Sequence, residues 1–89
     1  MVQVTKQAVQ QWVMIDYLAR KHRFEETITR MERKYGMTLD EFEKHIESTE
    51  KEVFEEWDDN IDWSAAVGML PDVLKGIEEI KKGSIEIIE

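Results

Sequence analysis

Cysteine is missing from this chain of 89 residues, which also contains only one proline and four glycines. Without cysteine the chain has neither a disulfide framework nor a thiolate metal site. The few glycines form no glycine-rich phosphate-binding loop. No run approaches the roughly 18 apolar residues of a membrane span, and the N-terminus lacks the charged, apolar and small-residue order of a signal peptide. We therefore expect a cytoplasmic protein without a membrane anchor.

Basic residues are also scarce, because twelve Lys and Arg stand against twenty Asp and Glu, for a formal net charge of −8. Phosphate contacts need clustered basic residues, so a nucleic-acid-binding surface is disfavoured. The basic run at residues 20–23 could contact nucleic acid, and a short strand followed by two helices superficially suggests a ribbon-helix-helix DNA binder. The hinge lacks the expected turn residues, however, and the strand offers little to read bases. The excess of carboxylates favours a basic protein partner, with solubility alone as the alternative.

The length of the chain predicts a single domain with a modest core. It is too short to provide both a large scaffold and a deep enzymatic cleft, so we expect a non-enzymatic protein without a cofactor. In outline we expect an N-terminal helix at residues 1–23, a helical body at residues 24–82, and a tail or short strand at residues 83–89.

A corner between two helices, at residues 35–43, is the clearest local signal. Gly36 can adopt the left-handed conformation that closes a helix, after a last turn that carries Arg33 and Lys34. Thr38 followed three residues later by Glu41 has the spacing of a capping box at a new helix start. The pattern therefore predicts a helix, a tight corner and a second helix.

The region before this corner is predicted to be largely helical. Residues 1–5 alternate apolar and polar side chains, which permits a short strand. Residues 6–20 have helical periodicity, and residues 12–19 are apolar nearly all round, so that part has to be covered on both sides. A second copy of the chain can supply the cover, and we expect a homodimer. The expected dimer interface consists of Trp12, Val13, Ile15 and Leu18.

Residues 24–35 carry a single apolar stripe, formed by Phe24, Ile28, Met31 and Tyr35. A polar run at residues 20–23 separates this stripe from the first helix without a Gly or Pro. One long helix and two helices with a corner are both compatible with this pattern.

Beyond the corner, Leu39, Phe42 and Ile46 predict a short helix that weakens at residues 48–49. Two apolar stripes follow on opposite faces, one through Phe54 and Trp57 and the other over residues 63–74. We favour a helix break within residues 58–60, and the alternative is one continuous helix that buries two faces.

Pro71 disfavours helical geometry at the preceding residue, so we expect a boundary or kink there and a last helix that runs from Pro71 to about residue 82. The expected buried side of that helix consists of Val73, Leu74, Ile77 and Ile80. Gly83 ends it, and residues 84–89 are rich in β-branched side chains, which permits a short strand. The whole pattern predicts an all-α fold of three to five short-to-medium helices in an antiparallel hairpin or bundle.

The strongest compositional bias is acidic, because residues 40–62 contain eleven Asp or Glu against two Lys. A solvated helix face is one explanation, since charged residues lie outside cores. The sharper hypothesis is a binding surface for a basic protein, because aromatic side chains supply buried area and carboxylates bind Arg in bidentate pairs. Two tryptophans, Trp57 and Trp63, flank the carboxylates Asp58, Asp59 and Asp62. Core packing is the alternative for each tryptophan.

Clustered carboxylates also raise magnesium-dependent nucleotide hydrolysis as a minor alternative. The pairs one turn apart are Glu52 and Glu55, Glu55 and Asp58, and Glu56 and Asp59. A helical nucleotide pyrophosphatase would use two such pairs on different helices, whereas here they fall together. His22 and His45 have no ligand partner at helical spacing, so both are interpreted as surface histidines. No serine has a neighbouring histidine, so nucleophilic catalysis has no support.

The corner KYGMTLDEFE, the segment EWDDNIDW and the final helix LKGIEEIKK together resemble a family of small archaeal and bacterial antitoxins of toxin–antitoxin pairs. The resemblance covers residues 28–82. It implies a non-enzymatic protein that masks a small basic toxin, commonly a ribonuclease or a nucleotidyltransferase-like protein. Many members have a DNA-binding N-terminus, which residues 1–23 do not clearly show. On this resemblance the toxin-facing or packing residues are Phe54, Trp57, Asp58, Asp59, Asp62 and Trp63.

Overall fold

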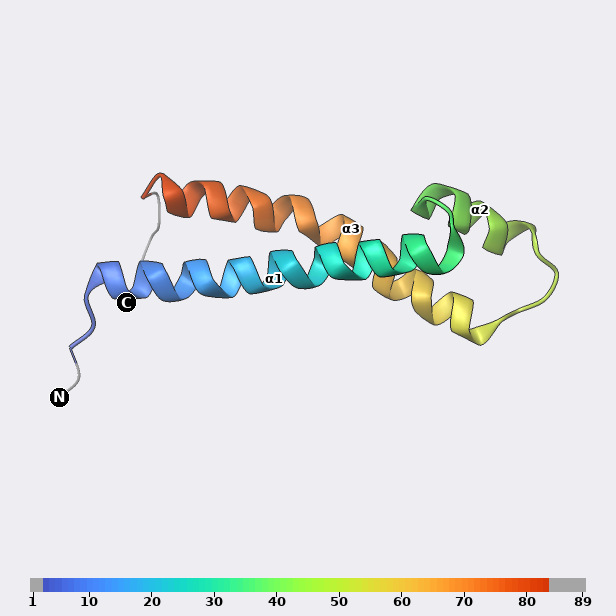
Figure 1. Ribbon diagram of the computed structural model, residues 1–89, viewed down its shortest axis with the longest axis horizontal. Coiled ribbons are helices and arrows are strands. Elements are labelled where there is room, and N and C mark those ends of the chain that lie inside the picture. The colour runs from blue at the N-terminus through green and yellow to red at the C-terminus, as the bar shows by residue number, and fades with distance from the viewer. Residues whose placement is uncertain (1–2, 84–89) are drawn as a thin grey trace.

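Three helices make up the described part of the protein, residues 3–83 of a computed structural model. They are α1 (Lys6–Tyr35), α2 (Leu39–Ser48) and α3 (Phe54–Lys81). Helices α1 and α3 form a long antiparallel hairpin, and α2 packs at the end where α1 finishes and α3 begins (Figure 1). The molecule is a rod with principal extents of 60 × 26 × 21 Å. The predicted all-α class and the antiparallel hairpin are confirmed, with three helices.

Helix α1 is continuous through the polar run at residues 20–23, which answers the question that its sequence left open. Nothing in that run interrupts a helix, and one ion pair, between Asp16 and Arg20 at 2.9 Å, has the i, i+4 spacing that favours helix. The Thr5 side chain caps the N-terminus by accepting a hydrogen bond from the backbone N–H of Ala8. The division expected at residue 23 therefore falls inside one helix.

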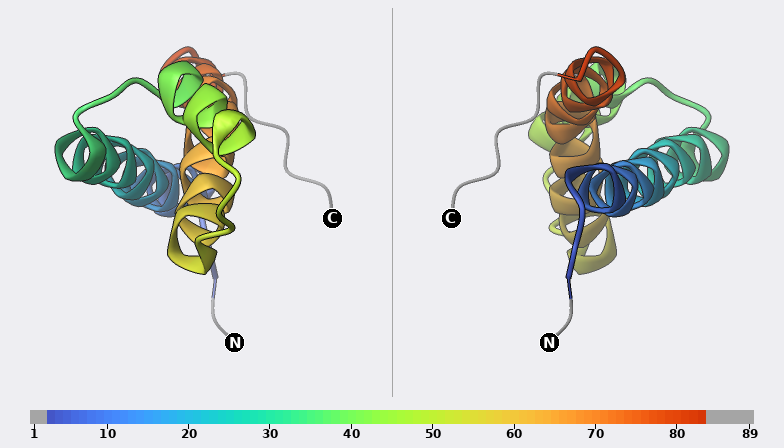
Figure 2. Two further views of the ribbon diagram at one scale, coloured as in Figure 1. Left: turned by 90° about the vertical axis from the view of Figure 1, so that its right-hand side faces the viewer. Right: turned by 90° about the vertical axis from the view of Figure 1, so that its left-hand side faces the viewer.

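The predicted corner is confirmed in detail. Gly36 has φ = 63° and closes α1 through its N–H, which donates to the carbonyl of Glu32. The capping box at the start of α2 is complete, because Thr38 Oγ1 accepts from the N–H of Glu41 and the Glu41 carboxylate accepts from the N–H of Thr38. The end-on views in Figure 2 show α2 stacked against α3 at this end of the rod.

One core cluster joins the three helices at the α2 end. Met31 of α1, Phe42 of α2 and Trp63 of α3 are almost completely buried. The rings of Phe42 and Trp63 are 5.3 Å apart, and the Tyr35 ring lies 4.2 Å from that of Phe42. These separations are typical of aromatic pairs, which add stabilisation beyond the area that they bury. The partly buried side chains around this cluster are Ile28, Tyr35, Met37, Leu39 and Ile46.

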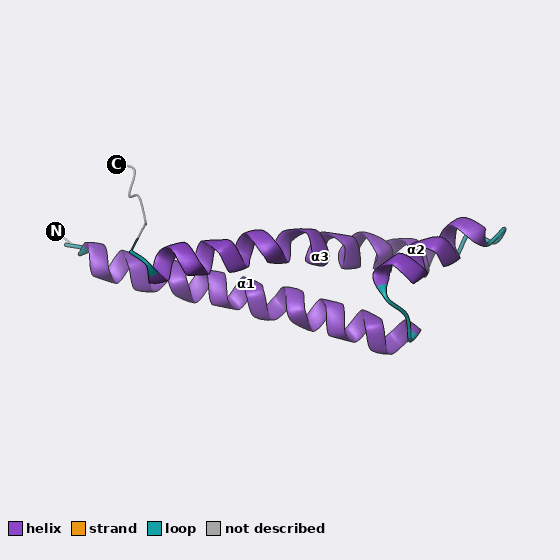
Figure 3. Cartoon of the chain, turned by 90° about the horizontal axis from the view of Figure 1, so that it is seen from above, coloured by secondary structure: helices purple, strands orange, loops and turns teal. Residues whose placement is uncertain are grey.

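Helix α3 is continuous, and this overturns two predictions (Figure 3). The break favoured at residues 58–60 is wrong, because the apolar stripe through Phe54 and Trp57 is left exposed and needs no separate helix to bury it. Of the boundary or kink expected at Pro71, the boundary is wrong, because α3 runs on from Phe54 to Lys81. Pro71 deprives the carbonyl of Val67 of its helical donor, but both residues are exposed, so water can reach that carbonyl.

At the other end of the hairpin, the described residues contribute two helices, α1 and α3. Val73, Ile77 and Ile80 of α3 are buried against α1, as expected, whereas Leu74 is 42% exposed, contrary to expectation. Gln10 of α1 donates its side-chain amide to the carbonyl of Ile80 at 2.9 Å. The described residues contain no strand, including residues 3–5, and the strand expected at residues 84–89 lies outside them.

Candidate protein-binding surface

The most exposed apolar side chains of α3 form a stripe on its first half. Phe54, Trp57 and Ile61 stand at i, i+3 and i+7, and their exposed fractions are 86%, 52% and 66%. At 100° per residue this stripe lies roughly opposite Trp63, which faces the core. Core packing is therefore the right interpretation for Trp63 and the wrong one for Trp57.

Carboxylates lie beside this stripe. Glu52, Phe54, Trp57, Asp58 and Ile61 line a shallow hollow of about 410 Å³. Asp62 is also exposed, on the side of the stripe where Asp58 lies. We call Phe54, Trp57, Asp58, Ile61 and Asp62 the acidic-aromatic surface.

Asp59 does not belong to this surface, although the sequence places it among the candidates. Its carboxylate accepts a hydrogen bond from the Tyr35 hydroxyl, and it forms an ion pair of 2.7 Å with Lys34. Lys34 also pairs with Glu55, so the last turn of α1 is tied to the first turns of α3. Asp59 therefore holds the hairpin together.

The electrostatics of this cluster follow from its contacts. Burial raises the pKa of Tyr35, and the hydrogen bond to Asp59 adds to the effect, so this pKa reaches about 12. Burial alone would raise the pKa of Asp59, but the hydrogen bonds from Lys34 and Tyr35 outweigh it and hold this pKa below its ordinary value. Hydrogen bonds to Asp59 and Glu55 raise the pKa of Lys34. All three groups keep their usual charge at neutral pH.

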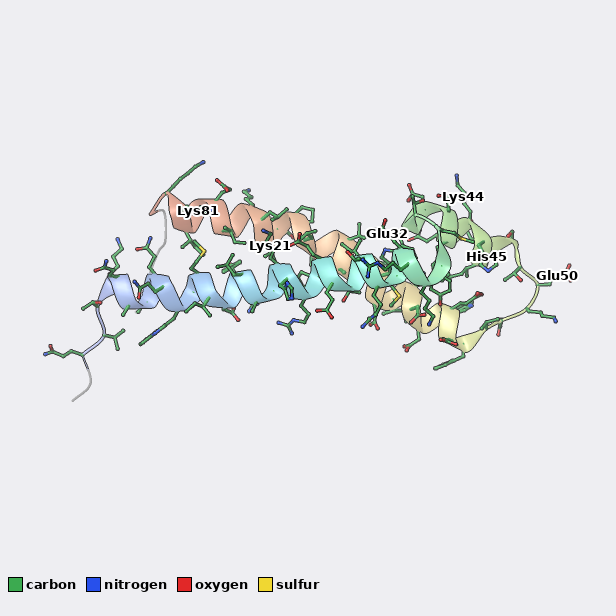
Figure 4. All side chains as sticks on the ribbon, viewed as in Figure 1. Lys21, Glu32, Lys44, His45, Glu50 and Lys81 are labelled. Atoms are coloured by element: carbon green, nitrogen blue, oxygen red, sulfur yellow. The ribbon has the colours of Figure 1, made fainter. Side chains whose placement is uncertain are left out.

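One more of the clustered acids, Glu56, has a partner inside the chain. Glu56 lies 3.2 Å from His45 of α2, which is half-buried beside α3, while His22 is an exposed surface histidine as expected. Figure 4 labels His45 at the α2 end of the rod. Since Glu55 and Asp59 are bound to Lys34, the carboxylate pairs of the hydrolase alternative are largely used in joining helices. Within residues 3–83 no group of three or more His, Cys, Asp or Glu is placed to hold a metal ion.

The residues expected at a dimer interface lie on different sides of α1. Trp12, Ile15 and Leu18 are exposed, as an unpartnered face requires, whereas Val13 is half-buried. Trp12 and Leu18 are about 120° apart around the helix. One flat interface therefore cannot be centred on all four residues.

Ile61 and Leu74 are among the exposed apolar residues that the sequence-based candidates omit. Ile61 follows Trp57 by four residues, so the periodicity that identified the stripe contains the signal for it. Leu74 has no such signal, because its exposure depends on how far α2 extends along the hairpin.

No helix among residues 3–83 is both long enough and apolar enough to cross a membrane. Comparison with protein-family models, with curated proteins and with solved structures finds no match.

Proposed function

We propose that the protein is a non-enzymatic binding module whose acidic-aromatic surface binds a basic protein, in the manner of an antitoxin that masks a small basic toxin. The observation that carries the proposal is the exposure of Phe54, Trp57 and Ile61 beside carboxylates on the same surface. Contiguous exposed apolar side chains with a polar rim are typical of protein-binding sites. A toxin made in the cytoplasm implies that the inhibitor acts there too.

The shape of the surface favours a helical or extended segment as the bound element. Anchors at i, i+3 and i+7 along a rigid helix match an amphipathic partner helix laid against them. Trp57 is the expected hot spot, because tryptophan contributes large apolar area at interface centres. Asp58 and Asp62 lie on one side of the anchors and can each accept a bidentate hydrogen-bond pair from an arginine of the partner.

The same residues make a poor case for hydrolysis. Glu55 and Asp59 pair with Lys34, and Glu56 contacts His45, so a nucleotide-bound magnesium ion would have to displace those partners. Self-association without a second protein is the remaining alternative. The protein is also proposed to be a homodimer, because exposed apolar side chains occur at both ends of the rod.

The test is binding to the product of the adjacent gene, measured by isothermal titration calorimetry with the purified proteins. The double variant Trp57→Ala, Asp58→Ala is expected to weaken the complex by roughly 30-fold or more, the effect of losing one interface hot spot. The matched control is Trp12→Ala, Asp16→Ala, which removes an exposed tryptophan and an exposed aspartate at the other end of the rod.

Equal losses in both double variants, or none in the first, would contradict the site assignment. Circular dichroism of each variant checks that helix content is unchanged. If the adjacent gene product does not bind the wild-type chain, the antitoxin-like function fails.

A further inference from the structure

Among residues 3–83, nothing covers the α2 side of the hairpin along the half of the rod that α2 does not reach. Phe42 of α2 covers Trp63 at one end. Val67, Leu70 and Leu74 follow Trp63 at i+4, i+7 and i+11, so they continue the same face of α3. Val67 and Leu74 are 39% and 42% exposed, and Leu70 is half-buried.

Helix α1 contributes to this uncovered side. Met14 of α1 and Lys81 of α3 line one hollow at the end of the hairpin, so they lie on the same side of the two helices. Leu74 precedes Lys81 by seven residues and Leu18 follows Met14 by four, which places both leucines on that side. We call Met14, Leu18, Val67, Leu70 and Leu74 the open hairpin face.

We infer that a second copy of this chain covers the open hairpin face, so that the two hairpins form a four-helix core with an α2 at each far end. The charge distribution favours a copy over a basic partner. Residues 6–23 and 67–83 carry seven Lys or Arg and four Asp or Glu, whereas residues 24–66 carry five against fourteen. A basic partner is attracted to the acidic end and not to this one.

The charged residues beside the open hairpin face are also compatible with a second copy of the chain. Pairs of mixed sign lie beside it, Lys21 with Glu25 and Glu78 with Lys81. Figure 4 labels Lys21 and Lys81 on this part of the rod, away from Lys44 and His45 of α2. Packing through this end keeps the two acidic ends apart, which avoids repulsion between like charges.

The open hairpin face is large enough for a dimer interface. Seventeen residues of each helix give a length of about 25 Å, and two adjacent helices are about 20 Å wide, so the flat footprint is roughly 500 Å². Side-chain relief increases the accessible area towards the ~800 Å² per partner of a standard interface. Four-helix bundles are the usual way in which two-helix layers bury their second side.

This dimer deepens the proposed homodimer by naming its surface. Leu18 belongs to the interface and Ile15 lies at its edge, whereas Trp12 and Val13 point elsewhere on α1. Both acidic-aromatic surfaces stay free, so each dimer binds two partners if the proposed function holds. The dimer itself needs no partner, and its test uses the chain alone.

Sedimentation velocity of the full chain tests the dimer. Wild-type protein is expected to sediment with twice the chain mass of 10.6 kDa, and Leu74→Lys as a monomer with unchanged helix content. The matched control is Met69→Lys, which is expected to stay dimeric. Met69 is 52% exposed but lies on the opposite side of the hairpin, in a hollow with Tyr17 and Phe24.

Spin labels test the arrangement independently, because the chain has no cysteine of its own. A label at Lys21→Cys is expected to lie much closer to its symmetry mate than a label at Glu47→Cys, on α2. A monomeric wild type, an unchanged mass for Leu74→Lys, or short distances between Glu47 labels would overturn the assignment. A wild-type monomer that dimerises when residues 84–89 are removed would show that this segment covers the face instead.

Discussion

Two glycines of α3 make opposite predictions for the same substitution. A helical glycine costs about 1 kcal/mol relative to alanine, so Gly→Ala in an open helix position stabilises by roughly that amount. A Cβ at Gly68 would meet nothing within 4 Å. Gly68→Ala is therefore expected to raise the free energy of unfolding by about 0.5–1 kcal/mol.

A Cβ at Gly76 would lie 2.6 Å from Cε1 of Tyr17, and 3.1 Å from both Cδ1 and Cζ. Because three ring atoms are this close, the whole ring has to move, and overpacking of this kind costs about 1–3 kcal/mol. After the gain in helix propensity, Gly76→Ala is expected to destabilise by about 0–2 kcal/mol.

Urea unfolding at one protein concentration measures both variants, since dimerisation would make stability depend on concentration. The two free energies of unfolding should differ by about 1–3 kcal/mol, with Gly76→Ala the lower. The double variant Tyr17→Ala, Gly76→Ala should be no less stable than Tyr17→Ala alone. Equal stabilisation by the two glycine substitutions would refute the close approach of α1 and α3 at Tyr17.

Two further predictions concern the junction of the helices. Asp59→Asn is expected to lower the free energy of unfolding by about 1–2 kcal/mol at neutral pH, because hydrogen bonds to a charged group are lost. The control, Asp62→Asn at an exposed position, should change it by less than about 0.5 kcal/mol. The folded chain holds the pKa of Asp59 below its ordinary value of 3.8, so the stabilisation by Asp59 is present above that pH and is lost as the pH falls through the folded pKa. Urea unfolding at acid pH should therefore show the stability difference between Asp59→Asn and wild type closing. A difference that does not depend on pH would contradict the pairing. Thr38→Ala should lower the free energy of unfolding by about 1 kcal/mol, because the N-terminal cap of α2 is lost. The control, Thr29→Ala at an exposed position inside α1, should lower it by less than half of that. Similar losses in the two variants would argue against the capping box.

Local chemistry explains which features the sequence predicts well. The corner depends on a left-handed glycine and on a threonine and a glutamate three residues apart, and each of these acts within one turn of the chain. The stripe of Phe24, Ile28, Met31 and Tyr35 likewise identifies the buried side of α1 without knowledge of its neighbours.

The two wrong predictions for α3, the break at residues 58–60 and the boundary at Pro71, depend on tertiary contacts that the sequence pattern does not show. The two stripes of α3 are visible in the sequence, but periodicity does not say which of them faces α1 and α2. Pairing of Asp59 with Lys34 and Tyr35 orients the helix, and these partners are more than twenty residues away. Two stripes on opposite faces predict a helix break at residues 58–60 if both stripes have to be buried. The fold buries only one of them and leaves Trp57 exposed, so no break is needed. The boundary at Pro71 is predicted from the backbone hydrogen bond that proline removes inside a helix. Because Pro71 is exposed, the freed carbonyl can bind water and the helix continues.

The continuity of α3 has a consequence for insertions and deletions. One residue added between Trp57 and Trp63 would rotate everything before it by about 100°, which would turn the anchors of the acidic-aromatic surface towards the core. Seven added residues would leave the two faces within about 20° of their present relation and lengthen the rod by about 10 Å. Homologues that keep both faces should therefore vary in length here by two or three whole helical turns, that is by about 7 or 11 residues, with a matching change in α1.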